Sequence, residues 1–289
     1  MNPYVELARP MNAAMASFSA LLGMLVVLGP DLADPDLLIP VTLGMMVPFF
    51  VTSGGNALND YMDHHVDREA HPGRPLPSGR LTMAQVLWFA MVCFIVGIVL
   101  SAAIVTISEI ELLPVLIAAL AITLLIGYEV VFKYRGLVGN MAVAFLSALT
   151  FVFGASVVAD PGHEGWVLVL ILFVLAFFAS LGREITKDIE DVEADMGARS
   201  TLPMKVGVDS AGTAATLSIL AAVLLSPWPY FTGAMGWPYL AVVIVADVAF
   251  IYSLSFVRSS PHNAQSIHKV GMMLALLAFL VGSLTGGIA

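Results

Sequence analysis

Nine long apolar runs constrain the fold of this chain more than any other feature of its sequence. A helix needs about 20 residues to cross the roughly 30 Å hydrocarbon core of a bilayer. Backbone polar groups cannot stay unpaired in lipid, so each run is expected to be an α-helix. The sequence therefore predicts an all-α integral membrane protein with nine transmembrane helices. The predicted spans are Met11–Leu28, Leu37–Leu58, Met83–Val105, Leu112–Phe132, Val138–Val158, Trp166–Leu181, Val208–Pro227, Pro238–Phe256 and Ile267–Gly287.

The composition agrees with a membrane protein and argues against two other classes. Hydrophobic residues make up 59% of the chain and charged residues only 11%, a balance that does not describe a soluble protein. The net charge of −9 argues against binding to nucleic acid. We expect residues 1–289 to form one catalytic domain embedded among membrane lipids.

The positive charges indicate which way the spans run. All 12 lysines and arginines fall in the N-terminal segment or at the loops that follow spans two, four, six and eight. Because such charges concentrate on the cytoplasmic side, we expect the N-terminus and these loops to face the cytoplasm of a multi-pass protein of the cell membrane. The residues are Arg9, Arg68, Arg74, Arg80, Lys133, Arg135, Arg183, Lys187, Arg199, Lys205, Arg258 and Lys269.

A few isolated residues carry weaker signals. Trp166, Trp228 and Trp237 fall at predicted outer span ends, where tryptophan anchors helices at the membrane interface. Asp247 lies in the middle of the eighth span, where a carboxylate is expensive unless it faces the protein interior. We expect Asp247 to make a polar contact, with its role left open.

Two sets of oxygen-bearing side chains follow predicted spans. In a continuous helix a spacing of four residues keeps three side chains within about 80° of arc on one face. The second set has the same kind of spacing and follows the sixth span. We call these sets the first ladder, which is Asn59, Asp63 and Asp67, and the second ladder, which is Asp188, Asp191 and Asp195.

The chemistry of the ladders points to a divalent cation and a phosphate ester. Carboxylates gathered at one mouth repel one another unless cations neutralise them, and ligand sets made only of oxygen favour Mg²⁺. Mg²⁺ in turn prefers a few carboxylates together with substrate phosphates. A diphosphate bound by arginines and a lysine, with its tail among the helices, would be a polyprenyl diphosphate whose leaving group is stabilised as it departs.

The chain resembles the UbiA superfamily of intramembrane prenyltransferases. The resemblance rests on the Asn-Asp-x-x-Asp-x-x-x-Asp motif at 59–67, the Asp-x-x-Asp-x-x-x-Asp motif at 188–195, and the Arg-Pro-Leu-Pro loop at 74–77. It implies a UbiA-like helical bundle with a cytoplasmic cap over a central cavity, and Mg²⁺-dependent transfer of a prenyl group from its diphosphate.

The resemblance also implies roles for particular residues. The metal ligands would be Asn59, Asp60, Asp63, Asp67, Asp188, Asp191 and Asp195. Among these, the carboxylates expected to act in catalysis are Asp63, Asp67, Asp191 and Asp195. The residues expected to bind substrate are Asn59, Arg9, Arg68, Arg74, Lys133, Arg183 and Lys187.

Within the superfamily the motifs are most similar to archaeal members that join geranylgeranyl diphosphate to the hydroxyl of geranylgeranylglyceryl phosphate. That acceptor is an anionic lipid, and the surplus of cations at the mouth could hold its phosphate, with Arg9, Arg74, Arg80 and Arg199 among them. The sequence identifies no general base, and it leaves the donor chain length and the oligomeric state open.

Two alternatives remain open at this point. A related enzyme could use an aromatic acceptor such as a hydroxybenzoate, a naphthoate or a chlorin, because the two motifs do not specify the acceptor. A cation transporter could also place carboxylates in a membrane. However, the ladders lie at one face and Asp247 is the one deep carboxylate, so the sequence offers no charged path across the bilayer.

Overall fold

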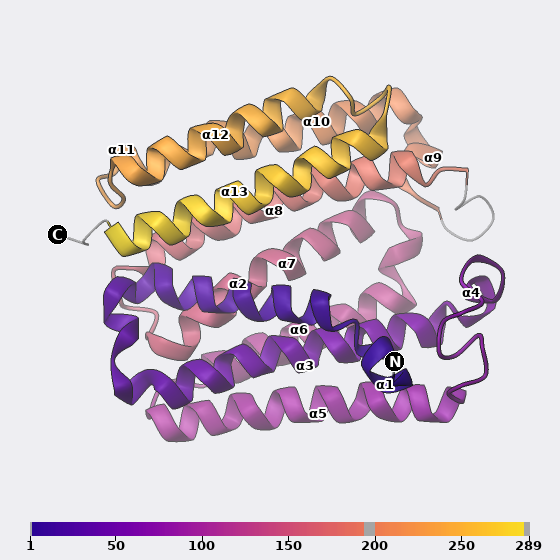
Figure 1. Cartoon of the computed structure of the whole chain (residues 1–289), viewed down its shortest axis with the longest axis horizontal. Coiled ribbons are helices and arrows are strands. Elements are labelled where there is room, and N and C mark those ends of the chain that lie inside the picture. Colours follow the sequence, from indigo (N-terminus) through magenta and orange to yellow (C-terminus); the bar gives the residue numbers. More distant parts are fainter. Residues whose placement is uncertain (1, 194–199, 286–289) are drawn as a thin grey trace.

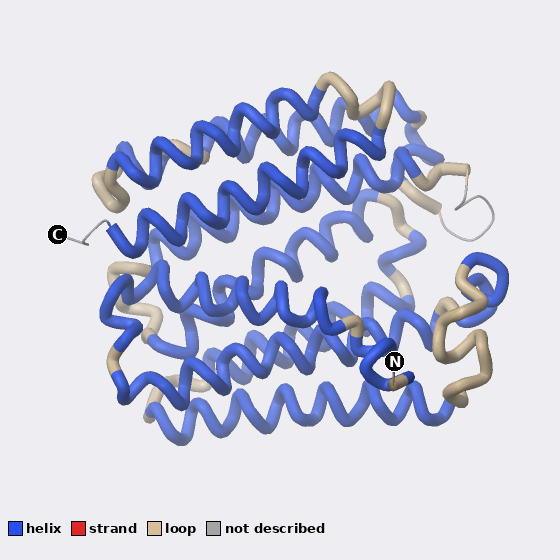
Figure 2. Tube along the Cα trace, viewed as in Figure 1, coloured by secondary structure: helices blue, strands red, loops and turns tan. Residues whose placement is uncertain are grey.

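A computed structural model describes residues 2–193 and 200–285, and every regular element in those ranges is a helix (Figure 2). Nine of these helices are long and apolar enough to cross a membrane, which confirms the predicted number of spans for the described chain. They are α2 (Pro10–Leu28), α3 (Leu38–Met62), α5 (Met83–Ser108), α6 (Leu113–Val130), α7 (Leu137–Val158), α8 (Trp166–Glu190), α10 (Val208–Leu225), α12 (Trp237–Leu254) and α13 (Pro261–Thr285).

Short elements join the spans at the two ends of the bundle. Figure 1 shows α1, α4 and α9 at one end and α11 at the other, so the cation-rich segments named above lie together. The short helices are α1 (Pro3–Ala8), α4 (His64–Ala70), α9 (Leu202–Val206) and α11 (Trp228–Phe231), and the 3₁₀ turns are η1 (Gly29–Ala33), η2 (Pro35–Leu37) and η3 (Phe132–Tyr134).

Two spans run further than their apolar residues alone predict. Helix α3 continues to Met62 rather than Leu58, and α8 continues to Glu190 rather than Leu181. The polar residues that follow each apolar run remain helical because their backbone hydrogen bonds still close within the segment. Both extensions carry ladder side chains beyond the apolar core, at the same end of the bundle.

Helix α7 joins the two halves of the chain, since it packs against α2 on one side and α8 on the other (Figure 1). Its contact with α2 is backbone to backbone. A Cβ at Gly154 would lie 1.9 Å from the Ala20 carbonyl oxygen, and a Cβ at Gly23 would lie 2.1 Å from the Phe151 carbonyl oxygen. Small residues permit such close approach between membrane helices.

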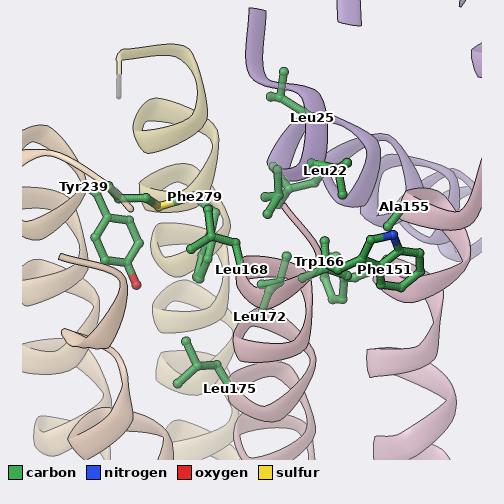
Figure 3. Close-up of a cluster of buried hydrophobic side chains, with 14 of the residues drawn as sticks. Leu22, Leu25, Phe151, Ala155, Trp166, Leu168, Leu172, Leu175, Tyr239 and Phe279 are labelled. Atoms are coloured by element: carbon green, nitrogen blue, oxygen red, sulfur yellow. The ribbon is translucent and has the colours of Figure 1, made fainter. Parts of the chain in front are cut away.

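A buried apolar cluster lies toward the end of the bundle opposite the ladders, and Figure 3 shows part of it. It brings together side chains of α2, α7, α8, α12 and α13, including Phe151, Leu172 and Phe279. Trp166 belongs to this cluster, is only 9% exposed, and donates its Nε1 proton to the Asp160 carbonyl at 2.7 Å. The prediction of an interfacial anchor was therefore wrong for Trp166, whereas Trp228 and Trp237 are exposed.

Asp247 makes a contact between helices. Its Oδ2 accepts a hydrogen bond of 2.6 Å from Ser226, the C-cap residue of α10. The Ser226 carbonyl in turn accepts a hydrogen bond of 2.6 Å from the Tyr239 hydroxyl. This polar contact ties α12 to the end of α10, so Asp247 has a structural partner.

Candidate functional site

The first ladder lies where α3 passes into α4 (Figure 1). Asp63 occupies the junction with φ −92° and ψ 9°, yet helical hydrogen bonding continues across it. The Asp63 amide donates to the Asn59 carbonyl at 2.9 Å, and the Asp67 amide donates to the Asp63 carbonyl at 2.9 Å. Asn59 and Asp63 therefore stay on one face, and Asn59 Nδ2 donates to Asp63 Oδ2 at 3.0 Å.

Lys133 provides the positive charge beside this ladder. It lies in η3, its side chain is 1% exposed, and its Nζ donates to Asp63 at 2.6 Å and to Glu129 at 2.7 Å. Asn59 also donates to Glu129, at 3.1 Å. Burial alone would lower the pKa of Lys133, but these hydrogen bonds and the two carboxylate charges raise it above its ordinary value. The ammonium is thus a fixed charge.

Two arginines approach the same helices through different carboxylates. Asp60 and Asp67 are only 2% and 5% exposed. Arg9 pairs with Asp60, while Arg74 Nη1 donates to Asp67 at 2.6 Å and lies 3.5 Å from Asp60. The arginine side chains remain about one-third exposed, at 32% and 29%. Since a guanidinium carries five N–H donors, each can hold its carboxylate and still present donors to a ligand.

Arg9 occupies a strained backbone position. With φ 48° and ψ 67°, it lies in the left-handed region between the end of α1 and Pro10, the first residue of α2. A residue with a side chain pays of order 1 kcal/mol or more for this conformation, which persists only where the surroundings fix it. The pairing with Asp60 and the abrupt start of α2 fix the Arg9 side chain beside the first ladder. We call this end of the bundle, where the two ladders and the cations around them lie, the mouth.

The loop at residues 71–82 is fastened to α1. Arg80 donates to the two carboxylate oxygens of Glu6 at 2.7 and 3.0 Å, and to the Gly73 carbonyl at 2.6 Å. Hydrogen bonding to Arg80 lowers the pKa of Glu6. We call this loop together with α1 the cap; Arg74 of the loop donates to Asp67 of the first ladder.

The second ladder meets the turn around η3 in a small polar pocket. Asp188 lies near the end of α8 and accepts a hydrogen bond of 2.9 Å from Asn140 Nδ2, on α7. The pocket has a volume of about 30 Å³. Lys133 is held by the first ladder and Asp188 belongs to the second, so this pocket brings the two motifs together. The lining residues are Tyr128, Lys133, Gly136, Gly139, Asn140, Val143, Glu184, Lys187, Asp188 and Thr201.

The remaining predicted site residues lie in different settings. Lys187 lines the pocket, and Arg183 donates to Glu184 at 2.6 Å. Asp191 is the C-cap residue of α8, directly after Glu190. Arg68 is exposed on α4. Asp195 and Arg199 lie outside the described residues.

The residues predicted from the sequence to form the site do not include Glu129, Asn140 or Thr201. Glu129 lies one helical turn before Lys133, a spacing that favours an ion pair and could have identified it. Asn140 and Thr201 are 6% and 4% exposed, and Asn140 Oδ1 and Thr201 Oγ1 find no hydrogen-bond partner among the described residues. Only the tertiary packing around the pocket, where α7 meets α8 and the start of α9, reveals these two.

The oxygen atoms around the pocket are suitable ligands for a hard cation. Asp188 supplies a carboxylate and Asn140 a buried amide oxygen without a donor, and both belong to the ligand types that Mg²⁺ selects. Within the described ranges no three carboxylate, histidine or cysteine side chains gather as a ready ligand set. Asp60, Asp63 and Asp67 instead pair with lysine and arginine.

Comparisons with known proteins agree with this geometry. The model of the UbiA prenyltransferase family matches residues 16–285. The chain is 40% identical to digeranylgeranylglyceryl phosphate synthase of Methanopyrus kandleri, over 98% of this chain and 100% of that protein. It is 36% identical to the protein of the same name from Methanosarcina mazei, over 96% of this chain and 97% of the relative.

Solved structures show the same fold. A structure described as giving insights into digeranylgeranylglyceryl phosphate synthase in membranes superposes with a TM-score of 0.81 at 30% identity, covering 97% of both chains. A UbiA homologue from Archaeoglobus fulgidus, bound to DMAPP and Mg²⁺, superposes with a TM-score of 0.73 at 17% identity, again covering 97% of both chains.

Proposed function

Because the chain belongs to the UbiA prenyltransferase family, we propose that this membrane enzyme transfers a geranylgeranyl group from geranylgeranyl diphosphate to the hydroxyl of geranylgeranylglyceryl phosphate. The names of its relatives from Methanopyrus kandleri and Methanosarcina mazei support these substrates. The distribution of cations at the mouth supports them independently.

The donor diphosphate would lie between the two ladders. Lys133 is held there by two carboxylates, and Lys187 lines the same pocket, so both ammonium groups can donate to phosphate oxygens. We assign the remaining donor contacts to Asn59, Arg68 and Arg183.

Mg²⁺ is the cofactor that suits these oxygen ligands. When bound, the ion would neutralise negative charge on the departing diphosphate. The ligands that we assign to it are Asn59, Asp60, Asp63, Asp67, Asp188, Asp191 and Asp195. Asp63, Asp67, Asp191 and Asp195 would act in catalysis by holding it.

The observation that carries the acceptor assignment is the separate arginine pair. Arg9 and Arg74 gather around Asp60 and Asp67, whereas Lys133 serves Asp63 and Glu129. The mouth therefore has two distinct clusters of cations, one more than a diphosphate alone requires. A phosphate on the acceptor would match two neighbouring guanidiniums, which bind phosphate oxygens through paired N–H donors.

We further propose that residues 1–289 act as one catalytic domain, with the mouth facing the cytoplasm. The packing of α7 on both α2 and α8 supports one structural unit. The placement of α1, α4 and α9 at one end supports the orientation, because it gathers the cationic segments on one side (Figure 1).

An acceptor competition tests the proposal. Purified protein would receive labelled geranylgeranyl diphosphate and Mg²⁺, with geranylgeranylglyceryl phosphate, 4-hydroxybenzoate and a dihydroxynaphthoate offered together. We expect transfer to the glyceryl lipid alone, and loss of transfer with EDTA. Transfer only to an aromatic acid would keep the prenyl transfer and overturn the acceptor.

A variant pair tests the arginine pair. Arg74→Leu should raise the KM for the glyceryl lipid by about tenfold or more, with little change in the KM for the donor. Removing an interaction that is equally strong in the ground state and the transition state raises KM. Arg258→Leu is a control, because Arg258 contacts Asp209 and Thr213 away from the ladders. Equal effects on both substrates would contradict a separate acceptor site.

A further inference from the structure

Asn140 is a buried residue of the pocket, and only one of its two side-chain polar atoms makes a hydrogen bond within the described residues. It lies near the start of α7, it is 6% exposed, and it lines the pocket that joins the two ladders. Its Nδ2 donates to Asp188 at 2.9 Å, but its Oδ1 has no partner among the described residues. A buried acceptor left in this state costs about 1 to 3 kcal/mol, so its retention calls for a ligand.

The neighbouring carboxylate fixes the orientation of the amide. A carboxylate only accepts hydrogen bonds, so the amide must turn its NH₂ group towards Asp188. The reverse orientation would place two acceptor oxygens against each other. Asn140 Oδ1 therefore points away from Asp188, where it can accept a hydrogen bond or bind a cation.

The pocket offers a carboxylate and an amide oxygen to a small guest. Its volume of about 30 Å³ is enough to admit water-sized guests, and Lys133 and Lys187 also line it. Asp188 adds negative charge at the amide. A phosphate oxygen would be repelled by Oδ1, because both atoms only accept hydrogen bonds, whereas a hard cation would be attracted by both oxygens.

We propose that Asn140 Oδ1 is a direct ligand of the divalent cation, contributed by α7 in addition to the two ladders. The inference rests on the proposed function for the identity of the cation. It gives Asn140 an arrangement like that of Asn59, whose amide nitrogen likewise donates to carboxylates, those of Asp63 and Glu129. Asn140 would link the cation held by Asp188 to the turn that carries Lys133.

Cation binding in the full-length protein tests this role without relying on turnover. Mn²⁺ replaces Mg²⁺ at oxygen sites and gives an EPR signal, so Mn²⁺ would be titrated into detergent-solubilised protein with and without inorganic pyrophosphate. Asn140→Leu removes both polar atoms, and we expect it to weaken Mn²⁺ binding by about tenfold or more. Thr150→Val, on the same helix, removes a hydroxyl that bonds only the Leu146 carbonyl, and should leave binding unchanged.

Asn140→Asp separates a ligand from a positioning residue. It keeps an oxygen at the Oδ1 position but loses the donor to Asp188, so a ligand role predicts Mn²⁺ affinity within about threefold of the wild type. Equal weakening in Asn140→Asp and Asn140→Leu would mean that the amide acts only by orienting Asp188, and would overturn the proposal. If Asn140→Leu does not fold, Asn140→Ala takes its place in the same comparison.

The outcome is independent of the reaction that the enzyme performs. Unchanged Mn²⁺ affinity in Asn140→Leu, as expected if the Lys187 ammonium is the true partner of Oδ1, overturns the ligand role even in an active enzyme. Absence of Mn²⁺ binding by the wild type overturns it also. Conversely, an expected pattern of affinities with no transfer to the glyceryl lipid would leave Asn140 a ligand and refute the proposed acceptor.

Discussion

At the scale of single residues, the mouth is built from charges that already have partners. Lys133 lies between Asp63 and Glu129, and Asn59 donates to both carboxylates. Such a network is stable only when complete, because a buried charge without its partner is costly. The same residues that we assign to ligand binding therefore also hold the end of α6 against α3.

Replacing Lys133 should damage stability and activity together. Lys133→Met leaves Asp63 and Glu129 without their cation, and we expect a loss of about 3 kcal/mol in unfolding free energy. Activity should fall by about 100-fold or more, because a preorganised donor to the leaving diphosphate is lost. Unfolding by SDS in mixed micelles and transfer of labelled prenyl groups measure the two effects.

The double variant Lys133→Met with Glu129→Gln separates the two losses. It should recover part of the stability, since one orphaned charge is removed, but none of the activity. Lys205→Met, at an exposed lysine of α9, is the matched control. Full activity in Lys133→Met would contradict a role for this lysine at the diphosphate.

The raised pKa of Lys133 predicts a stability change in alkaline solution. Its folded pKa lies above the ordinary value of 10.5, so its contribution is complete below about pH 10.5 and is lost as the pH rises through the folded pKa. The unfolding free energy of the wild type should therefore fall above that pH. The fall should be smaller in Lys133→Met, and parallel curves for the two proteins would exclude this linkage.

At the scale of elements, helix ends and helix contacts place the ladders. Helices α3 and α8 carry their polar residues past the apolar core, and α7 holds the two halves of the chain at a fixed distance. The contact of α7 with α2 depends on Gly23 and Gly154, where no side chain fits. A change at this contact would shift Asn140, which lies on the same helix.

Filling the α2–α7 contact should therefore destabilise the protein. In Gly154→Val the new Cβ would lie 1.9 Å from the Ala20 carbonyl, and overpacking of this kind costs about 1 to 3 kcal/mol. We expect a lower melting temperature in detergent than for the wild type. Gly162→Ala, where a Cβ meets nothing within 4 Å, should melt as the wild type does, and equal melting of all three proteins would refute the close contact.

At the scale of the whole molecule, lysines and arginines gather at one end of the bundle, which we call the charged end, whereas the loops at the other end carry carboxylates such as Asp31, Glu109 and Asp160. Helix α1 and the C-terminal ends of α3 and α8 lie at the charged end (Figure 1), and the cluster that contains Trp166 lies at the other. Lysine and arginine in short loops favour the cytoplasmic side. The donor and the acceptor would then both be met from the cytoplasm.

Labelling of introduced cysteines would test that orientation. Gly73→Cys lies in the cap, and Gly162→Cys lies in the loop between α7 and α8, at the opposite end; both positions have open space around a Cβ. In intact cells a membrane-impermeant maleimide should label Gly162→Cys alone, and permeabilised cells should label both. The native Cys93 is buried and should stay unlabelled. The reverse pattern would invert the topology.

The sequence by itself determined the class of fold, because apolar runs of sufficient length in lipid can only be helices. It also located both motifs, since ligand types and their spacing along one helix are local properties. Asn59 and Asp63 could be placed on one face in this way, and the structure keeps that geometry. Glu129 lay within reach of the same reasoning, because its partner Lys133 is four residues away.

Only the tertiary structure decided which charges meet. That Arg9 pairs with Asp60, that Asn140 meets Asp188, and that Trp166 is buried all depend on contacts between helices distant in the chain. Periodicity shows which face of a helix is polar or apolar but not which helix covers it. That choice follows from how small residues such as Gly23 and Gly154 let particular helices approach, which is a property of pairs of helices.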